Sequence, residues 1–454
     1  MLQQRLSEDR RFGAEVLATL RLASPLIVGQ VSAMGMNVAD TLIAGRLGPA
    51  ALGGVAVGTA IYSCAMLLTI GILGALTPTV AQLVGARRLD EIASSVRQAW
   101  WLAAALGLIV MIICLNAHYV LVAIGIDAAL MPHATGFLAG VAFAGPGLAA
   151  FFVLRGFSDG LGRTKPGMVA SACGLLLLLP IAWAFSMGYG PIPAMGTFGL
   201  GLATAIALAL ESVGLAIYLH HQHYFRSFGS ILKIERPKSV QIKALLAIGW
   251  PMAFAWQMEG GLFIVVALLM GRIGGDWAAA HQIAINVASV AFMIPLGLAQ
   301  AVTVRVGHAR GANDVPGVRS AGLSGLALAL GTQVFSAAVM IIFAAPITRL
   351  YAPTAEELVP LTVQLMLLAG IFQLSDGIQV VAAGALRGLK DTRYPMFITA
   401  VAYWGVGFPL SYTLGFHLGW GAPGLWIGFI AGLTMAAILM NWRFATMLRR
   451  LSMA

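Results

Sequence analysis

Charged residues are scarce in this chain of 454 residues, since only 10% are Asp, Glu, Lys or Arg. A soluble domain carries roughly 25% charged residues, so the composition excludes a soluble enzyme or nucleic-acid module. Disorder requires low hydrophobicity and high charge, and it is excluded by the hydrophobic content of 59% and the mean hydropathy of +0.89. The sequence predicts a polytopic membrane protein.

Cysteine is equally scarce. The three cysteines, Cys64, Cys114 and Cys173, lie in apolar segments without framework spacing, which argues against disulfides and a cysteine metal site. We recognise no Ser-His-Asp set, no paired Cys/His ligands and no phosphate-binding loop. We therefore expect neither an enzyme nor an ATP-driven pump, and no bound cofactor.

Long apolar runs dominate the chain. About 20 apolar residues span a hydrocarbon core of about 30 Å, and these runs lack the alternation of a membrane barrel. We therefore predict an all-α polytopic membrane protein with twelve transmembrane helices, the first of them a retained span and not a signal peptide. The runs lie at about 22–44, 50–75, 98–117, 134–154, 167–188, 196–220, 244–270, 277–302, 321–345, 358–385, 395–416 and 422–442.

The basic residues give this topology an orientation. With the N-terminus in the cytoplasm, 24 of the 27 Lys and Arg residues fall in cytoplasmic loops or termini, and only Arg46, Arg272 and Arg349 lie outside. This bias follows the positive-inside rule. The net charge of +10 then faces anionic lipid, so we expect membrane lipid and not nucleic acid as its partner.

The two halves of the chain resemble each other. Pro25 matches Pro251, and Gly45-Arg46-Leu47-Gly48 matches Gly271-Arg272-Ile273-Gly274, at an offset of 226 residues. Later, Leu154-Arg155-Gly156 matches Leu386-Arg387-Gly388. An even number of spans per half makes this a parallel repeat. It predicts six-helix lobes at 1–220 and 244–454, joined by a cytoplasmic linker at 221–243.

Four acidic residues lie within the predicted spans, namely Asp40, Glu211, Glu259 and Asp376. A carboxyl group inside a membrane is costly and by default a functional candidate. We expect no Lys or Arg deep enough in a span to pair with these acids. Such a carboxyl would hold a proton unless a cation replaces it, and an antiporter requires that exchange.

The predicted depth in the membrane differs among three of these acids. At 1.5 Å per residue, Glu259 lies roughly 20 Å below the outer end of its span and Asp376 roughly 16 Å above the inner end, both near the midplane. Asp40 lies nearer the outside. Each acid could instead be a protonated carboxyl that bonds to a neighbouring helix, and for Glu211 the two interpretations are balanced. Gly260 and Gly261 after Glu259 permit close approach of another backbone.

Short motifs resemble one family of transporters. They are Val38–Gly48, Gly249–Glu259, Val302–His308 and Ser375–Gln379 with its continuation Gly384–Thr392. Together they resemble the MATE (multidrug and toxic compound extrusion) family, in its NorM-like bacterial branch. The similarity covers nearly all twelve spans.

The resemblance implies two lobes around a V-shaped cavity and export of lipophilic cations in exchange for H⁺ or Na⁺. It implies that Glu259 and Asp376 bind the ion, a Na⁺ there being the only metal expected, and that Asp40 is the acid of the first lobe. It further implies a bacterial inner membrane location with both termini cytoplasmic. We expect a monomer.

Two positions depart from the family pattern. Phe372 stands where the family often has Tyr, one turn before Asp376, which slightly favours H⁺. Leu178 and Ala182 flank Pro180 where an Asn pair is frequent, so the polar network around Asp40 is thinner. In-span residues that could line a substrate cavity are Gln257, Gln282, Asn286 and Phe372, although the amides could instead bridge helices.

Three rival functions remain open. A lipid-linked oligosaccharide flippase of similar architecture is the main alternative, and it would need a cationic cavity for pyrophosphate. An intramembrane enzyme would need a catalytic dyad in register, and a channel would conduct without a counter-gradient.

Overall fold

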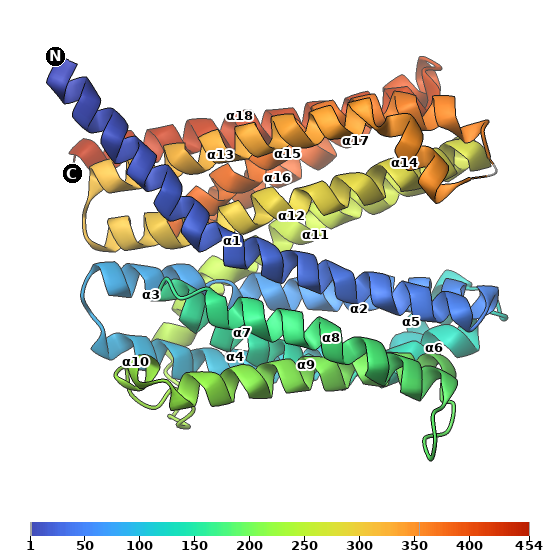
Figure 1. The fold of residues 1–454 in the computed structure, drawn as a ribbon, viewed down its shortest axis with the longest axis horizontal. Coiled ribbons are helices and arrows are strands. Elements are labelled where there is room, and N and C mark those ends of the chain that lie inside the picture. Colours follow the sequence, from blue (N-terminus) through green and yellow to red (C-terminus); the bar gives the residue numbers. More distant parts are fainter. Residues whose placement is uncertain (1, 354, 454) are drawn as a thin grey trace. The chain divides into compact units, whose positions relative to one another are not determined.

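The computed structural model describes residues 2–353 and 355–453, with side chains from Gly13 onward. Within these ranges the chain is helical apart from short connections and one isolated bridge between Tyr189 and Ile192. The predicted all-α fold class is therefore confirmed. Figure 1 shows the long helices that make up the chain.

Eleven helices in the described ranges are long and apolar enough to cross a membrane. A twelfth span is formed by α6 (Met131–Val141) and α7 (Ala144–Gly160), which are bent by 46° at the break between them. These spans follow the order of the predicted runs. Many of them extend beyond the apolar run that predicted them; α12, for example, has 37 residues, about 55 Å at 1.5 Å per residue.

The chain forms two compact units. Unit 2 comprises Val28–Ala253, and unit 1 comprises Met1–Ile27 together with Phe254–Ala454. These boundaries lie beside the repeat-related prolines Pro25 and Pro251 and differ from those of the predicted lobes. The reason is that two long helices, α1 (Leu2–Arg46) and α11 (Ser239–Ile273), each contribute residues to both units.

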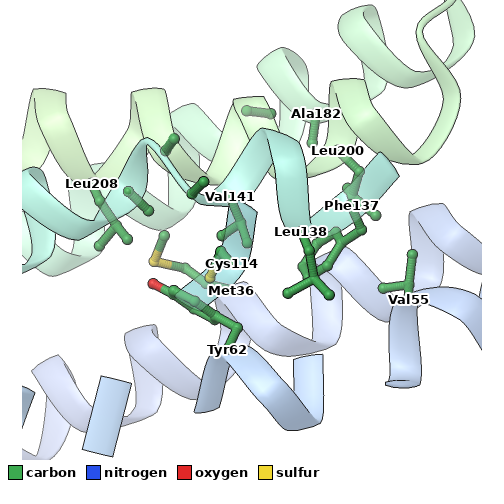
Figure 2. Packing of buried hydrophobic residues seen from close by; sticks show 14 of the residues in the cluster. Met36, Val55, Tyr62, Cys114, Phe137, Leu138, Val141, Ala182, Leu200 and Leu208 are labelled. Carbon is green, nitrogen blue, oxygen red and sulfur yellow. The ribbon is translucent and has the colours of Figure 1, made fainter. Parts of the chain in front are cut away.

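Unit 2 contains the end of α1 and the start of α11. The Cβ of an alanine at Gly249 of α11 would lie 2.3 Å from the carbonyl oxygen of Ile72, so glycine permits the close packing of α11 there. Figure 2 shows part of the hydrophobic core of this unit. Its other helices are α2 (Pro49–Leu73), α3 (Leu76–Gly85), α4 (Asp90–Leu115), α5 (Ala117–Ile124), α6, α7, α8 (Lys165–Met187), α9 (Gly196–His221) and α10 (His223–Arg226).

Unit 1 contains the start of α1 and the end of α11. Thr19 of α1 lies 3.3 Å from Ser324 between their hydroxyl oxygens, and Glu15 forms an ion pair with Arg305. These contacts explain why the first residues of the chain belong to this unit. Its other helices are α12 (Gly275–Gly311), α13 (Val315–Ile342), α14 (Ala344–Tyr351), α15 (Leu358–Gly388), α16 (Arg393–Thr399), η1 (Ala400–Gly407), α17 (Phe408–Tyr412), η2 (Thr413–His417) and α18 (Gly421–Met453).

The eleventh span widens around a proline. The π-helical stretches η1 and η2 flank α17, whose second residue is Pro409. Proline lacks an N–H and its ring crowds the preceding turn, and wider turns of this kind often occur at functional sites. The wider turns set the positions of the Tyr403 and Trp404 side chains, which belong to η1.

Candidate functional site

Glu259 and Asp376 meet in unit 1. Glu259 lies on α11 and is partly buried, whereas Asp376 lies on α15 and is 3% exposed. The two carboxyl groups interact electrostatically. Among the described residues, Oδ1 of Asp376 has no hydrogen-bond partner. Two acids 117 positions apart in the sequence thus lie close enough to interact electrostatically, with Asp376 buried and Glu259 partly buried.

A tyrosine and a glutamine complete the polar surroundings of Glu259. The Tyr403 hydroxyl donates a hydrogen bond of 2.6 Å to Oε1 of Gln379, and Tyr403 also interacts electrostatically with Glu259. Both residues are buried. The sequence analysis missed them, although Gln379 follows Asp376 at the three-residue spacing that shares a helix face. Tyr403 carried no such signal, because η1 is distant in the sequence.

Arg387 lies beside the same site. Its side chain is buried, interacts electrostatically with Glu259 and lies over the Trp256 ring, with Cζ 5.9 Å from the centroid. Its Nε and Nη2 have no hydrogen-bond partner among the described residues, so Arg387 influences Glu259 at a distance, and the expectation that no Lys or Arg pairs with the acids stays a prediction. Helical side chains point toward the N-terminus of their helix, so the guanidinium of Arg387 reaches back from the end of α15 toward Glu259.

Gly261 provides the close approach that its sequence position suggested. The indole nitrogen of Trp404 donates a 3.1 Å hydrogen bond to the carbonyl of Met258. A Cβ at Gly261 would lie 3.1 Å from Cζ2 of the same indole. The glycine therefore lets η1 pack against α11 next to Glu259.

The residues expected to line a cavity occupy different surroundings. Gln282 donates a 3.3 Å hydrogen bond to Asn286 on the exposed side of α12, and Gln257 is partly buried on α11. Phe372 is 1% exposed, and its ring centroid lies 4.9 Å from that of Phe429. At this position the phenyl ring of Phe372 is part of an aromatic core, where a tyrosine would add a hydroxyl group. A shared cavity stays a prediction.

Asp40 forms a separate site in unit 2. Its carboxyl is 8% exposed, and the Thr204 hydroxyl lies 3.1 Å from Oδ2 and 3.3 Å from Oδ1. The same hydroxyl lies 3.2 Å from the Leu200 carbonyl oxygen, and since a hydroxyl has a single proton to donate, the carboxyl and the carbonyl compete for it. Leu178 and Ala182 are fully buried and supply no polar group. Thr204, a threonine in an apolar run, was missed from the sequence.

Glu211 also lies in unit 2, on α9. It is 6% exposed and interacts electrostatically with Arg155 of α7. Arg155 forms an ion pair with Asp159, and the expectation that the in-span acids have no Lys or Arg partner stays a prediction here. Arg155 matches Arg387 in the sequence repeat, so equivalent arginines lie beside buried carboxyl groups in both units.

Membrane-crossing helices that enclose buried carboxyl groups and arginines are typical of a polytopic membrane transporter. Comparison with known families agrees. The family model MatE matches residues 25–184 and 251–413, and the two matching segments begin 226 residues apart at the repeat prolines. The chain belongs to the MatE family of transporters, as the sequence motifs predicted.

Known proteins similar to this chain cover almost its whole length. A protein of Xanthomonas campestris named "Probable multidrug resistance protein NorM" is 45% identical over 98% of this chain and 97% of its own. One of the same name from Xanthomonas axonopodis is 43% identical over 97% and 96%. The crystal structure of a eukaryotic MATE transporter matches with a TM-score of 0.87 at 19% identity, covering 97% and 98% of the two chains, which supports the fold.

Proposed function

We propose that this protein is a multidrug efflux antiporter that exports lipophilic cations in exchange for H⁺ or Na⁺. One observation carries the proposal: Glu259 and Asp376 share a buried site in which an oxygen of Asp376 lacks a hydrogen-bond partner among the described residues. That oxygen is where a proton or a Na⁺ would bind. The names of the similar NorM proteins support multidrug substrates.

We attribute the coupling between ion binding and drug binding to the charges of the site. Glu259 and Asp376 interact with each other, and Arg387 interacts with Glu259, so ionisation of both acids would leave an uncompensated negative charge, which is costly in a buried site. Binding of one proton or one Na⁺ removes this charge. If the ion weakens binding of the cationic drug, the drug must weaken binding of the ion equally, and exchange follows.

The oxygen donors allow either ion, and one feature favours H⁺. The carboxyl oxygens, Tyr403 and Gln379 surround the site. Na⁺ is a hard cation that prefers several oxygen ligands. Phe372 supplies none, since its ring packs with Phe429 and Trp426. We propose H⁺ as the coupling ion and keep Na⁺ as the alternative for the experiment to decide.

The remaining parts of the proposal rest on the predictions made from the sequence. The protein would reside as a monomer in the bacterial inner membrane, with both termini in the cytoplasm and with lobes 1–220 and 244–454 joined by the linker 221–243. Apart from the coupling ion it would require no cofactor. The presence of membrane-crossing helices supports the membrane location.

Efflux from cells tests the proposal. Glu259→Gln and Asp376→Asn should each abolish energy-dependent efflux of ethidium, a fluorescent lipophilic cation, while the protein remains in the membrane. Glu356→Gln is the matched control, because Glu356 is an exposed acid that pairs with Arg349. Energy-dependent efflux retained in both site variants would refute the roles assigned to these residues.

The flippase alternative is not favoured. A site for lipid-linked pyrophosphate requires an excess of positive charge, whereas in unit 1 two acids interact with each other and one arginine, Arg387, interacts with Glu259. The similar proteins are also named as multidrug resistance proteins.

A further inference from the structure

The linker at 221–243 is fixed to the first half of α4 by hydrogen bonds to its backbone. Trp101 of α4 donates from its indole nitrogen to the carbonyl of Glu235 at 2.9 Å. Gln98 donates to the carbonyl of Arg236 at 3.2 Å and accepts from the backbone nitrogen of Lys238 at 2.7 Å. The segment from Glu235 to Lys238 therefore has a defined position on α4.

Trp101 also indicates the depth of the linker in the membrane. It is 42% exposed, and on the same face of α4 it is followed by the exposed side chains of Leu108, Ile109 and Ile112. Large apolar side chains that stay exposed over about three turns of a membrane-crossing helix face acyl chains. Tryptophan is enriched where this region meets the lipid headgroups. The hydrogen bond from Trp101 therefore places the linker at this interface and not in bulk water.

The linker exposes aliphatic and basic side chains at this depth. Ile234 is 86% exposed, and Leu232 is exposed as well. Lys233 and Arg236 are also exposed, and neither forms an ion pair among the described residues. Glu235 is the only acid of the linker, against five Lys and Arg residues, and its carboxylate is already paired with Arg97 and Lys238. The exposed surface of the linker is thus basic and apolar together.

We propose that the linker is a binding site for an anionic phospholipid, in which Ile234 lies among the acyl chains and Lys233 and Arg236 contact the phosphate. Such a lipid supplies the negative charge that these basic side chains lack within the protein, and its acyl chains cover the exposed aliphatic side chain. The depth set by Trp101 favours a lipid over a soluble acidic protein. The predicted orientation makes this the inner leaflet. The inference goes beyond the proposed ion exchange and does not depend on it.

A spin label at Ile234→Cys tests the depth. Cys64→Ser and Cys173→Ser would first remove the two exposed native thiols, and the labelled protein would be placed in vesicles that contain phosphatidylglycerol. The nitroxide should collide more often with oxygen, which dissolves among acyl chains, than with a water-soluble nickel complex. A label at Ala312→Cys, in the exposed turn after α12, should show the opposite preference. Equal accessibility to nickel at the two positions would overturn the proposal.

Lipid titration followed by native mass spectrometry tests the charge. Anionic phosphatidylglycerol should bind the solubilised protein more tightly than neutral phosphatidylcholine. The double variant Lys233→Gln with Arg236→Gln should raise the Kd for phosphatidylglycerol about fivefold for each charge removed. Arg319→Gln is the matched control, because it removes an exposed basic residue of α13 in unit 1, and it should leave this Kd unchanged.

Equal binding of the two lipids by the wild type would contradict the lipid site, and so would an unchanged Kd in the double variant. Neither experiment involves a drug or an ion gradient. Failure of the proposed antiport would therefore leave both results unaffected, and the two proposals can be refuted separately.

Discussion

The hydroxyl of Tyr403 and the amide of Gln379, 24 positions apart, are joined by a hydrogen bond of 2.6 Å beside Glu259. Tyr403 comes from the π-helical stretch η1 and Gln379 from α15. The bond thus fixes two helices around the acid that we propose to bind the coupling ion.

Removal of the Tyr403 hydroxyl should weaken ion binding. In Tyr403→Phe the ring still fills its buried position, but Glu259 and Gln379 lose a partner. A hydrogen bond between membrane helices contributes about 1 kcal/mol, so the ion concentration for half-maximal uptake should rise about fivefold. Tyr412→Phe, at a partly buried ring that stacks on Phe416, should leave that concentration unchanged. An unchanged value in Tyr403→Phe would remove Tyr403 from the site.

Loss of the pair between Asp391 and Arg443 should destabilise unit 1. The two side chains are about 10% and 9% exposed, and Nε of Arg443 lies 2.7 Å from Oδ2 of Asp391. Asp391→Asn leaves a buried arginine without its anion, which costs about 3–5 kcal/mol. Thermal unfolding in detergent should show a large decrease in Tm, and the added change Arg443→Met should recover part of it. A Tm equal to that of the wild type would show that the pair contributes little.

The close contact of α17 with α18 should not tolerate a methyl group. A Cβ at Gly428 would lie 2.1 Å from the backbone nitrogen of Ser411. Gly428→Ala should therefore cost about 1–3 kcal/mol or more and lower the yield of folded protein. Gly331→Ala is the matched control, because nothing lies within 4 Å of that position, and it should be neutral or stabilising by about 0.5–1 kcal/mol. Equal unfolding temperatures for the two variants would contradict this packing.

The linker should detach from α4 in acid. Arg97 and Lys238 form ion pairs with Glu235, and the hydrogen bond from Lys238 holds the pKa of Glu235 below its ordinary value of 4.5. A depressed pKa stabilises the folded state above the ordinary value, and this contribution is lost as pH falls through the folded value. The protection of residues 231–238 against hydrogen exchange, taken relative to the intrinsic exchange rate at each pH, should therefore decrease in that range.

Glu235→Gln removes the titrating group and provides the control for this experiment. Its linker should exchange faster than that of the wild type at neutral pH and should respond less to acid. Gln98 accepts from the backbone nitrogen of Lys238 at 2.7 Å, so part of the attachment should persist in the variant. The same acid response in the wild type and the variant would exclude Glu235 as the cause.

The acids could be predicted from the sequence because carboxyl groups are rare and costly in apolar runs. Counting residues along the spans predicts that Glu259 and Asp376 lie near the midplane. In the structure the two carboxyl groups interact electrostatically. The spans were predictable because a chain segment in a bilayer must satisfy its own backbone hydrogen bonds, and a long apolar run does so as a helix.

The partners of the acids could not be predicted, because they depend on packing between distant helices. Thr204 lies 164 positions from Asp40 and Tyr403 lies 144 positions from Glu259, and neither stands out from its surroundings. Arg387 was assigned to the helix end, since counting follows Cα positions and ignores the reach of a long side chain. The compact units differ from the predicted lobes because α1 and α11 each contribute residues to both units.

Uptake of ethidium into inside-out vesicles tests the central claim most directly. A proton gradient, acidic inside, and then a Na⁺ gradient would be imposed on vesicles that contain the wild type, Glu259→Gln or the control Glu356→Gln. We predict uptake under one of the two gradients, the proton gradient by preference, that is abolished in Glu259→Gln and retained in the control. Uptake that survives Glu259→Gln, or no wild-type uptake under either gradient, would contradict ion-coupled antiport at this site.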